Sequence, residues 1–141
     1  MISSLDKQAY IDELWNTELK GGIELSEYST FLAKDAGIAL VSGAFIAAII
    51  VSCSAIESHL RFDGAQGRSL YELMTRVGFS QSLADEINKV RKFRNEWVHV
   101  NEPELDEKLL KNPEMIEKQC EEMAMLAYQC LVRALCFNQY V

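Results

Sequence analysis

Three residues in one short segment could together handle a phosphate ester. The chain has only two histidines, and one of them, His99, follows Arg94 by five residues. Histidine gains and loses a proton near neutral pH, and a guanidinium can hold a phosphate through two parallel hydrogen bonds. Asn95 lies four residues before His99, so these two side chains share a face if the segment is helical. The segment therefore predicts a site that binds a phosphate and transfers a proton at it.

Positive charge gathers just before this segment. Four of the six residues from 89 to 94 are cations, and Phe93 or Trp97 could stack on a base if exposed. The whole chain has a net charge of −7 and a pI near 4.8, which opposes a general affinity for nucleic acid. Residues 102–122 add eight acidic residues against three lysines. Any anion-binding surface is therefore local, and Lys89, Arg91 and Lys92 are the candidates to bind a nucleic acid and guide it to Arg94.

The composition favours a single all-α domain over residues 1–141. Hydrophobic residues make up 49% of the chain, enough for one core, while two prolines and seven glycines argue against a turn-rich β fold. Apolar spacing and capping residues predict a small bundle of about five helices. The expected helices cover residues 4–19, 26–62 with or without a break near 35–37, 69–77, 80 or 82 to about 100, 103–110, and 113 to about 137.

The first and last of these helices should each turn an apolar stripe to the core. On the first helix the stripe comprises Leu5, Ala9, Ile11, Leu14, Trp15 and Leu19. On the last helix, which Asn112 is expected to cap, it comprises Ile116, Cys120, Met123, Ala127, Cys130, Leu131 and Leu135. The acidic residues of the last helix are expected to face water, and they are Glu114, Glu117, Glu121 and Glu122.

Residues 36–56 carry no charge over 21 positions, which reaches the length that a bilayer requires. Twelve of these residues are Ala, Gly, Ser or Cys, and Ala39, Gly43 and Ala47 form a stripe that another helix can approach closely. The bulkier Ile38 lies on a second stripe with Val41, Phe45 and Ile49. We expect a buried helix. A membrane span is the less favoured alternative, because no basic cluster flanks the segment on one side.

The four cysteines show no metal-binding spacing. Cys53, Cys120, Cys130 and Cys136 contain no C-x-x-C pair, so the sequence predicts no zinc site and no other metal or cofactor. Free thiols among apolar residues are typical of a protein in the reducing cytosol. The N-terminal residues interleave acidic and apolar side chains and do not resemble a signal peptide. A cytoplasmic location is therefore expected.

The run Arg94-Asn95-Glu96-Trp97-Val98-His99, at the end of an expected helix, resembles the R-x(4-6)-H motif of the HEPN superfamily. The resemblance spans residues 30–138 approximately and includes the helix that carries Glu57 and the loop at 63–67. It implies a small helical bundle with metal-independent endoribonuclease activity, in which the ribose 2′-hydroxyl attacks the adjacent phosphate. It also implies a homodimer whose two motifs face each other across a shared cleft.

The resemblance further implies a role for each site residue. His99 is the base or the acid, the partner's His99 is the other, and Arg94 stabilises the charge that develops on the phosphorane. Asn95 orients a neighbour or binds the phosphate, and Glu57 positions Arg94. Toxins and phage-defence effectors of this superfamily suggest RNA as the substrate and an antitoxin or regulatory protein as a partner.

Two other interpretations remain open. One is a non-catalytic HEPN-like dimeric module that binds a protein or a nucleotide, which the acidity of the chain and Glu96 within the motif favour. The other is purely structural, because Arg94 and His99 also suit the negative end of a helix dipole. Glu57 and Arg61 likewise form an ordinary i, i+4 pair, and His59 is expected to be a partly buried or surface residue.

Overall fold

The computed structural model describes residues 1–99 and 106–140, and in this part of the chain it confirms the expected all-α fold. Five helices have 15 to 24 residues and two have 6 residues, in agreement with the expectation of about five. The helices are α1 (Ser4–Glu18), α2 (Glu27–Ser42), α3 (Phe45–Phe62), α4 (Leu70–Thr75), α5 (Gln81–Val98), α6 (Asp106–Lys111) and α7 (Pro113–Cys136).

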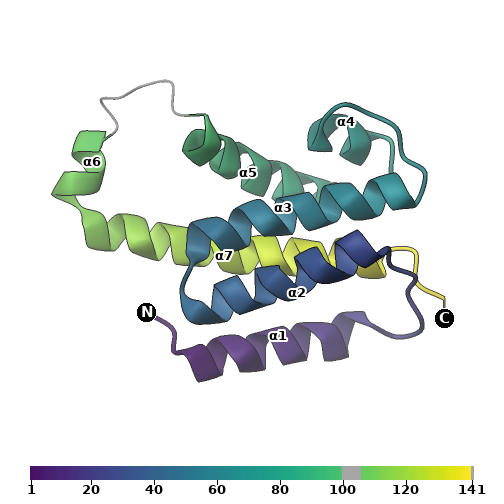
Figure 1. Cartoon of the computed structure of the whole chain (residues 1–141), viewed down its shortest axis with the longest axis horizontal. Coiled ribbons are helices and arrows are strands. Elements are labelled where there is room, and N and C mark those ends of the chain that lie inside the picture. The colour runs from purple at the N-terminus through teal and green to yellow at the C-terminus, as the bar shows by residue number, and fades with distance from the viewer. Residues whose placement is uncertain (100–105, 141) are drawn as a thin grey trace.

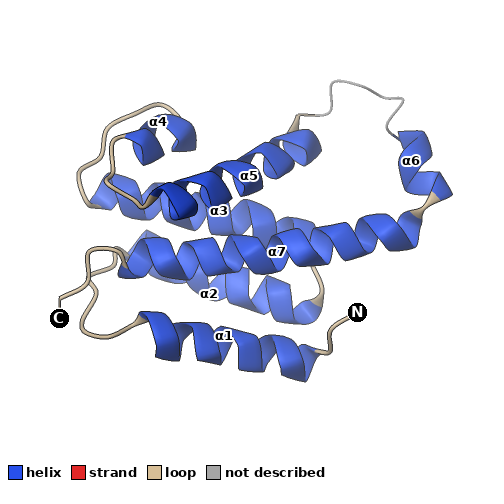
Figure 2. Ribbon diagram, turned by 180° about the vertical axis from the view of Figure 1, so that it is seen from behind, coloured by secondary structure: helices blue, strands red, loops and turns tan. Residues whose placement is uncertain are grey.

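The helices pack around α3 and α7. Figure 1 shows α2 and α3 side by side and running in opposite directions, with α7 behind them. Seen from the other side, α7 lies in front, with α5 along one flank and α1 along the other (Figure 2). The short helix α4 contacts both α3 and α5. The buried core draws on α1, α2, α3, α4, α5 and α7, so α5 is fixed on the bundle along its first three turns.

The segment expected as one helix from residue 26 to 62 is two helices, and the expected break at 35–37 is wrong. The chain turns at Gly43, which ends α2 with a φ of 86°. This left-handed conformation suits a residue without a Cβ, and the amide of Ala44 closes the turn on the carbonyl of Ala39 at 2.9 Å. Gly37 instead lies inside α2, where an added Cβ would sit 3.6 Å from the ring of Tyr128. That distance is an ordinary contact, and Gly37 does not end the helix.

Splitting the segment also changes which small residues allow the close approach of helices. Ala47 and Ile38 are exposed, so the expected stripes are only partly correct. On α2 and α3, the alanines with no exposed surface are Ala36, Ala48 and Ala55, and the serines with none are Ser29 and Ser52. The reason is that the turn rotates α3 relative to α2. Residues that would share a face in one continuous helix therefore point in different directions.

The apolar helix α3 has the length and composition of a membrane span. Its mean hydropathy is 1.4 over 18 residues, and half of that window is buried inside the bundle. A core helix of a water-soluble protein has the same two properties, and α3 is enclosed by α2, α5 and α7. The burial of half of this window agrees with the expected buried helix.

Two charged residues, Lys7 and Glu121, are buried, the second of them against expectation. Glu121 was expected on the solvent face of the last helix, yet its side chain is only 5% exposed and lies 3.3 Å from Nζ of Lys7, which is equally buried. Nζ of Lys7 also lies 4.5 Å from the centre of the Phe45 ring. Leu5, expected in the core, is exposed in its place. The ion pair fixes the rotation of α1 about its axis so that Lys7 faces inward. Because the partner lies on α7, the spacing of residues within α1 does not predict this orientation.

The helix starts and ends follow the capping residues closely. Ser80 accepts a hydrogen bond from the amide of Leu83 at 3.2 Å and begins α5, which ends at Val98, slightly before the expected position. Asn112 precedes α7 as expected, although its side chain makes no capping hydrogen bond. The expected helix start at Pro103 lies outside the described residues, and α6 is described from residue 106.

Removing one partner of the buried ion pair should strongly destabilise the fold. We expect Lys7→Met to lower the free energy of unfolding by about 3–5 kcal/mol, because Glu121 would keep a buried, unpaired charge. The double variant Lys7→Met/Glu121→Leu should lose much less than the two single variants together. Urea unfolding followed by circular dichroism measures these changes, and exposed Lys118→Met is the control, with an expected change of about 0.5 kcal/mol or less. Additive losses in the double variant would contradict the coupling.

The turn at Gly43 gives a second stability test. Gly43→Ala should cost about 1–2 kcal/mol, because alanine is strained at a φ of 86°. Gly78→Ala is the matched control, since an added Cβ meets nothing within 4 Å at either glycine and Gly78 has no positive φ. Thermal unfolding should therefore show a lower Tm for the first variant only. Equal Tm values for the two variants would exclude backbone strain as the cause.

Candidate functional site

Helix α5 carries the expected site at its C-terminal end. Its buried face comprises Leu83, Ile87 and Val90, and Arg94 continues this stripe by one further turn. Arg94 therefore points toward the packed side of the helix and is half-buried. His99 follows the last turn, and its amide donates to the carbonyl of Asn95 at 2.9 Å. The helix thus places a half-buried guanidinium and an exposed imidazole at one end.

The guanidinium of Arg94 is held by a neutral amide. Its Nε and Nη2 both donate to Oδ1 of Asn95, at 3.1 and 2.8 Å. The group also lies close to Cys53 on α3. Burial raises the pKa of the Cys53 thiol to about 11, while the positive charge of Arg94 opposes that rise. Arg94 therefore brings its charge into the contact between α3 and α5.

Arg91, one turn earlier, is held in the same way. Its Nε and Nη2 donate to Oδ1 of Asn88 at 3.0 and 2.8 Å. Its guanidinium carbon also lies 5.1 Å from the centre of the Tyr71 ring on α4, a distance typical of a cation–π contact. Neutral groups therefore orient both Arg91 and Arg94, and these contacts do not neutralise the positive charge of either side chain.

Two of the other four arginines are paired with carboxylates, whereas Arg68 and Arg76 have no carboxylate partner within the described residues. Arg61 binds Glu57 at 2.8 Å, and Arg133 binds Glu18 at 3.2 Å. For Arg91 and Arg94, no carboxylate oxygen of the described residues lies within 4.0 Å. A guanidinium that is oriented but not neutralised can still bind an anion with its remaining N–H groups. The pair on α5 is therefore suited to phosphate.

Glu57, which was expected to position Arg94, binds a different arginine in the structure. Its carboxylate pairs with Arg61 on the same helix, as the i, i+4 spacing predicts, and no ion pair joins it to Arg94 within the described residues. Glu57 still lies near enough to raise the pKa of the Cys53 thiol. The contact that orients Arg94 comes from Asn95.

The remaining expected site residues lie on different parts of α5. Lys89, Lys92 and His99 are exposed. Lys92 is seven residues before His99 and shares its face, whereas Lys89 is turned about 160° from Arg91 on an ideal helix. The aromatic candidates Phe93 and Trp97 are half-buried and packed against the core, with ring centres 6.4 Å apart. Packing, not base stacking, accounts for these two rings.

Two residues near the site were not identified from the sequence. Asn88 lies three residues before Arg91, a helical spacing that could have indicated the contact. Tyr71 lies on a different helix, and no local pattern connects it with Arg91. Helical spacing alone could therefore have identified the contact of Asn88, whereas the contact of Tyr71 depends on where α4 packs.

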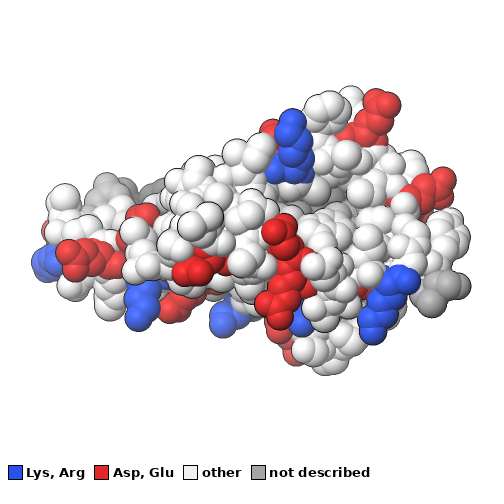
Figure 3. All heavy atoms as spheres, turned by 90° about the horizontal axis from the view of Figure 1, so that it is seen from below, with Lys and Arg blue, Asp and Glu red and all other residues white. Residues whose placement is uncertain are grey.

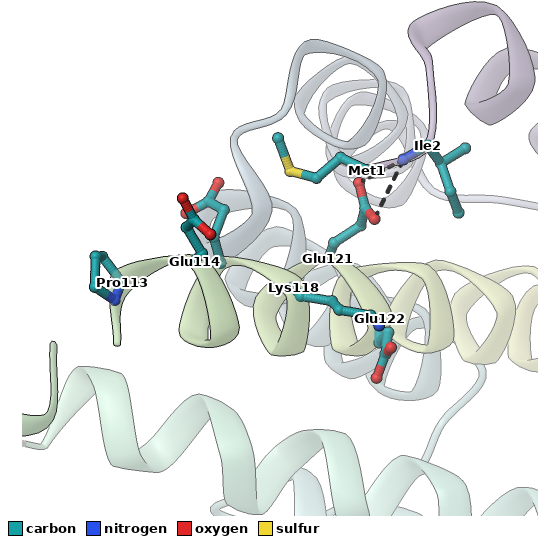
Figure 4. Close-up of a pocket in the computed structure, with 8 residues that line it drawn as sticks. Met1, Ile2, Pro113, Glu114, Lys118, Glu121 and Glu122 are labelled. Carbon is teal, nitrogen blue, oxygen red and sulfur yellow. Dashed lines mark hydrogen bonds between the residues drawn. The ribbon is translucent and has the colours of Figure 1, made fainter. Parts of the chain in front are cut away.

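The largest cavity described, of about 830 Å³, lies elsewhere. Figure 4 shows it between the N-terminal residues and the start of α7. Four of its lining side chains are acidic and one is basic, so it would repel a phosphate: they are Glu114, Glu117, Glu121, Glu122 and Lys118. Figure 3 shows the molecule from below, where acidic and basic side chains alternate with neutral ones. The charges that line the cavity therefore do not favour binding of a phosphate there.

The second histidine is buried at the far end of α3. His59 is 3% exposed, and its Nε2 lies 3.2 Å from Oδ2 of Asp63. Its Nδ1 has no hydrogen-bond partner among the residues described. Burial lowers the pKa of His59, and the charge of Asp63 opposes this shift. The side chain is more completely buried than the partly buried or surface position expected for it.

No protein-family model, curated protein or solved structure matches this chain. The resemblance to HEPN domains accordingly rests on the Arg94–His99 motif and the helical layout. The activity that it implies is therefore a proposal.

The buried His59 should make stability depend on pH. Because its folded pKa is lowered from 6.5, the unfolded chain binds the extra proton and the fold loses stability as the pH falls below that value. The Tm should drop more steeply between about pH 7.5 and about pH 5.5 in the native protein than in His59→Gln, which keeps a neutral donor. Parallel pH profiles of the two proteins would show that His59 does not titrate in this way.

Proposed function

We propose that this protein is a HEPN-type, metal-independent endoribonuclease of the toxin or phage-defence kind, acting in the cytoplasm as a homodimer. The observation that carries the proposal is the arrangement at the end of α5. A half-buried arginine is oriented by Asn95, has no carboxylate partner among the described residues, and precedes an exposed histidine by five residues at the same end of the helix. Oriented positive charge and an accessible imidazole are what phosphodiester cleavage requires.

The proposed reaction is an internal transesterification. One His99 takes the proton of the ribose 2′-hydroxyl, and the oxygen attacks the adjacent phosphorus. The bond to the 5′-oxygen breaks, and the partner's His99 gives that oxygen a proton. The products are a 2′,3′-cyclic phosphate and a 5′-hydroxyl. Arg94 would stabilise the additional negative charge on the phosphorane through its charge-assisted hydrogen bonds.

The need for a dimer follows from the number of accessible histidines. The reaction uses one base and one acid, and the chain has two histidines. His59 lies in the last turn of α3, where it is buried against Asp63. Each chain therefore has one exposed imidazole, that of His99. A two-fold axis beside the end of α5 would supply the second. RNA is the proposed substrate, and an antitoxin or regulatory protein is a proposed partner.

A second function is a non-catalytic dimeric module that binds a protein or nucleotide partner. Exposed Glu96, inside the motif, and the net charge of −7 favour it. In that case the two arginines on α5 would hold an anion without any proton transfer. The two functions differ in what His99 does, so a histidine variant separates them.

Cleavage of single-stranded RNA in the presence of EDTA tests the proposal. His99→Ala should reduce the rate by about 10²–10⁴-fold, and Arg94→Ala by about 10²–10³-fold. Lys20→Ala removes an exposed cation near the end of α1 and should leave the rate unchanged. The products should carry cyclic phosphate ends. Equal cleavage by native and His99→Ala protein, or none by either, would exclude the nuclease.

Mixed dimers test whether the site is shared. If each cleavage needs both copies of His99, the rate should fall with the square of the native fraction when native and His99→Ala chains are refolded together. A linear fall would show that one chain carries a complete site. Analytical ultracentrifugation of each mixture provides the control that all samples are dimeric.

A further inference from the structure

Tyr71 presents an exposed aromatic ring beside the site. It lies on α4, where Leu70, Leu73 and Met74 are buried and fix the helix on the bundle. Ser69 caps α4 by accepting from the amide of Glu72 at 3.2 Å. Tyr71 itself is 49% exposed, so a rigid support holds its ring at the surface.

The ring of Tyr71 and the guanidinium of Arg91 form one unit with Asn88. Arg91 is fixed by the fork on Asn88 and lies 5.1 Å from the ring centre. The cation covers part of the ring while about half of the residue stays open to solvent. An open aromatic surface next to an uncompensated guanidinium can accept the two parts of a nucleotide, a flat base and a phosphate.

Helix geometry places this unit in line with the cleavage site. Asn95 follows Arg91 by four residues, and His99, which caps α5, follows Asn95 by four, so the three positions turn by about 40° at each step along one side of an ideal helix. At 1.5 Å per residue, Arg91 lies about 6 Å from Asn95 and about 12 Å from His99 along the helix axis. An RNA strand that follows this face would pass from His99 toward Tyr71 within one or two nucleotides.

We infer that Tyr71 stacks on an unpaired base of the RNA, one or two nucleotides from the cleaved phosphate, while Arg91 binds the phosphate of that nucleotide. The inference rests on the proposed function and specifies its substrate. Stacking requires a base with a free face, so the substrate is single-stranded RNA or an unpaired loop. Because every base has such a face, Tyr71 selects for unpaired structure more than for sequence.

Binding of fluorescent, single-stranded RNA to the His99→Ala protein tests the inference without cleavage. Introducing Tyr71→Ala should weaken affinity by about fivefold to a hundredfold, as expected for one lost stacking contact. Tyr71→Phe keeps the ring and should bind within about twofold of the parent protein. Tyr28→Ala removes a tyrosine that is 81% exposed on α2 and should leave affinity unchanged. The Tm of each variant establishes that it is folded.

A second readout separates stacking from a mere loss of support for Arg91. An RNA that carries 2-aminopurine near the expected position should lose fluorescence on binding when the ring is present, in the parent and in Tyr71→Phe, and not in Tyr71→Ala. A duplex of the same sequence should bind more weakly to the parent and show no effect of Tyr71→Ala.

The possible failures are distinguishable. If the parent protein binds single-stranded RNA and Tyr71→Ala binds it equally well, the role of Tyr71 is wrong and the proposed nuclease is unaffected. Equal affinity of the parent for duplex and single strand would also overturn the inference. If neither binding nor cleavage of RNA is detected with the native protein, the proposed function and the inference fail together.

Discussion

The burial of α3 is the constraint on which the rest of the fold depends. This helix is apolar over most of its length, and residues such as Ile49, Cys53 and Ile56 are 1% exposed. Removing it from water requires several neighbouring helices. The turn at Gly43 folds α2 back along one side, α7 covers another, and α5 lies along a third. The position of the site follows, because α5 meets α3 where Arg94 approaches Cys53.

Charged side chains near the core are stabilised in two different ways, by an opposite charge or by a neutral amide. Lys7 and Glu121 are both about 95% buried and neutralise each other, and this pair connects α1 with α7. Arg94 is less buried and is held by the uncharged Asn95. A carboxylate in that position would have stabilised the arginine and cancelled its charge. The neutral amide gives less electrostatic stabilisation than a carboxylate would and leaves the positive charge of Arg94 uncancelled.

The sequence predicts the helices well because their signals are local. Ser80 caps α5 and an apolar stripe with helical spacing follows, so the helix and the motif at its end were both predictable. The sequence does not separate Gly37 from Gly43, because either glycine could end a helix, and only the backbone shows that Gly43 takes the left-handed conformation. The pair of Lys7 with Glu121 and the contact of Tyr71 with Arg91 join distant segments, which no local spacing encodes.

The acidity of the chain has a consequence for how such a site would recognise RNA. A net charge of −7 repels a polyanion at long range, but at physiological ionic strength that repulsion decays over about 8 Å. The face of α5 from Arg91 to His99 extends about 12 Å, so a bound strand would experience mainly these nearby cations. RNA that cannot approach this face would gain little attraction from the rest of the surface. Discrimination then depends on geometry at the end of α5, where a strand must offer a phosphate and an unpaired base together.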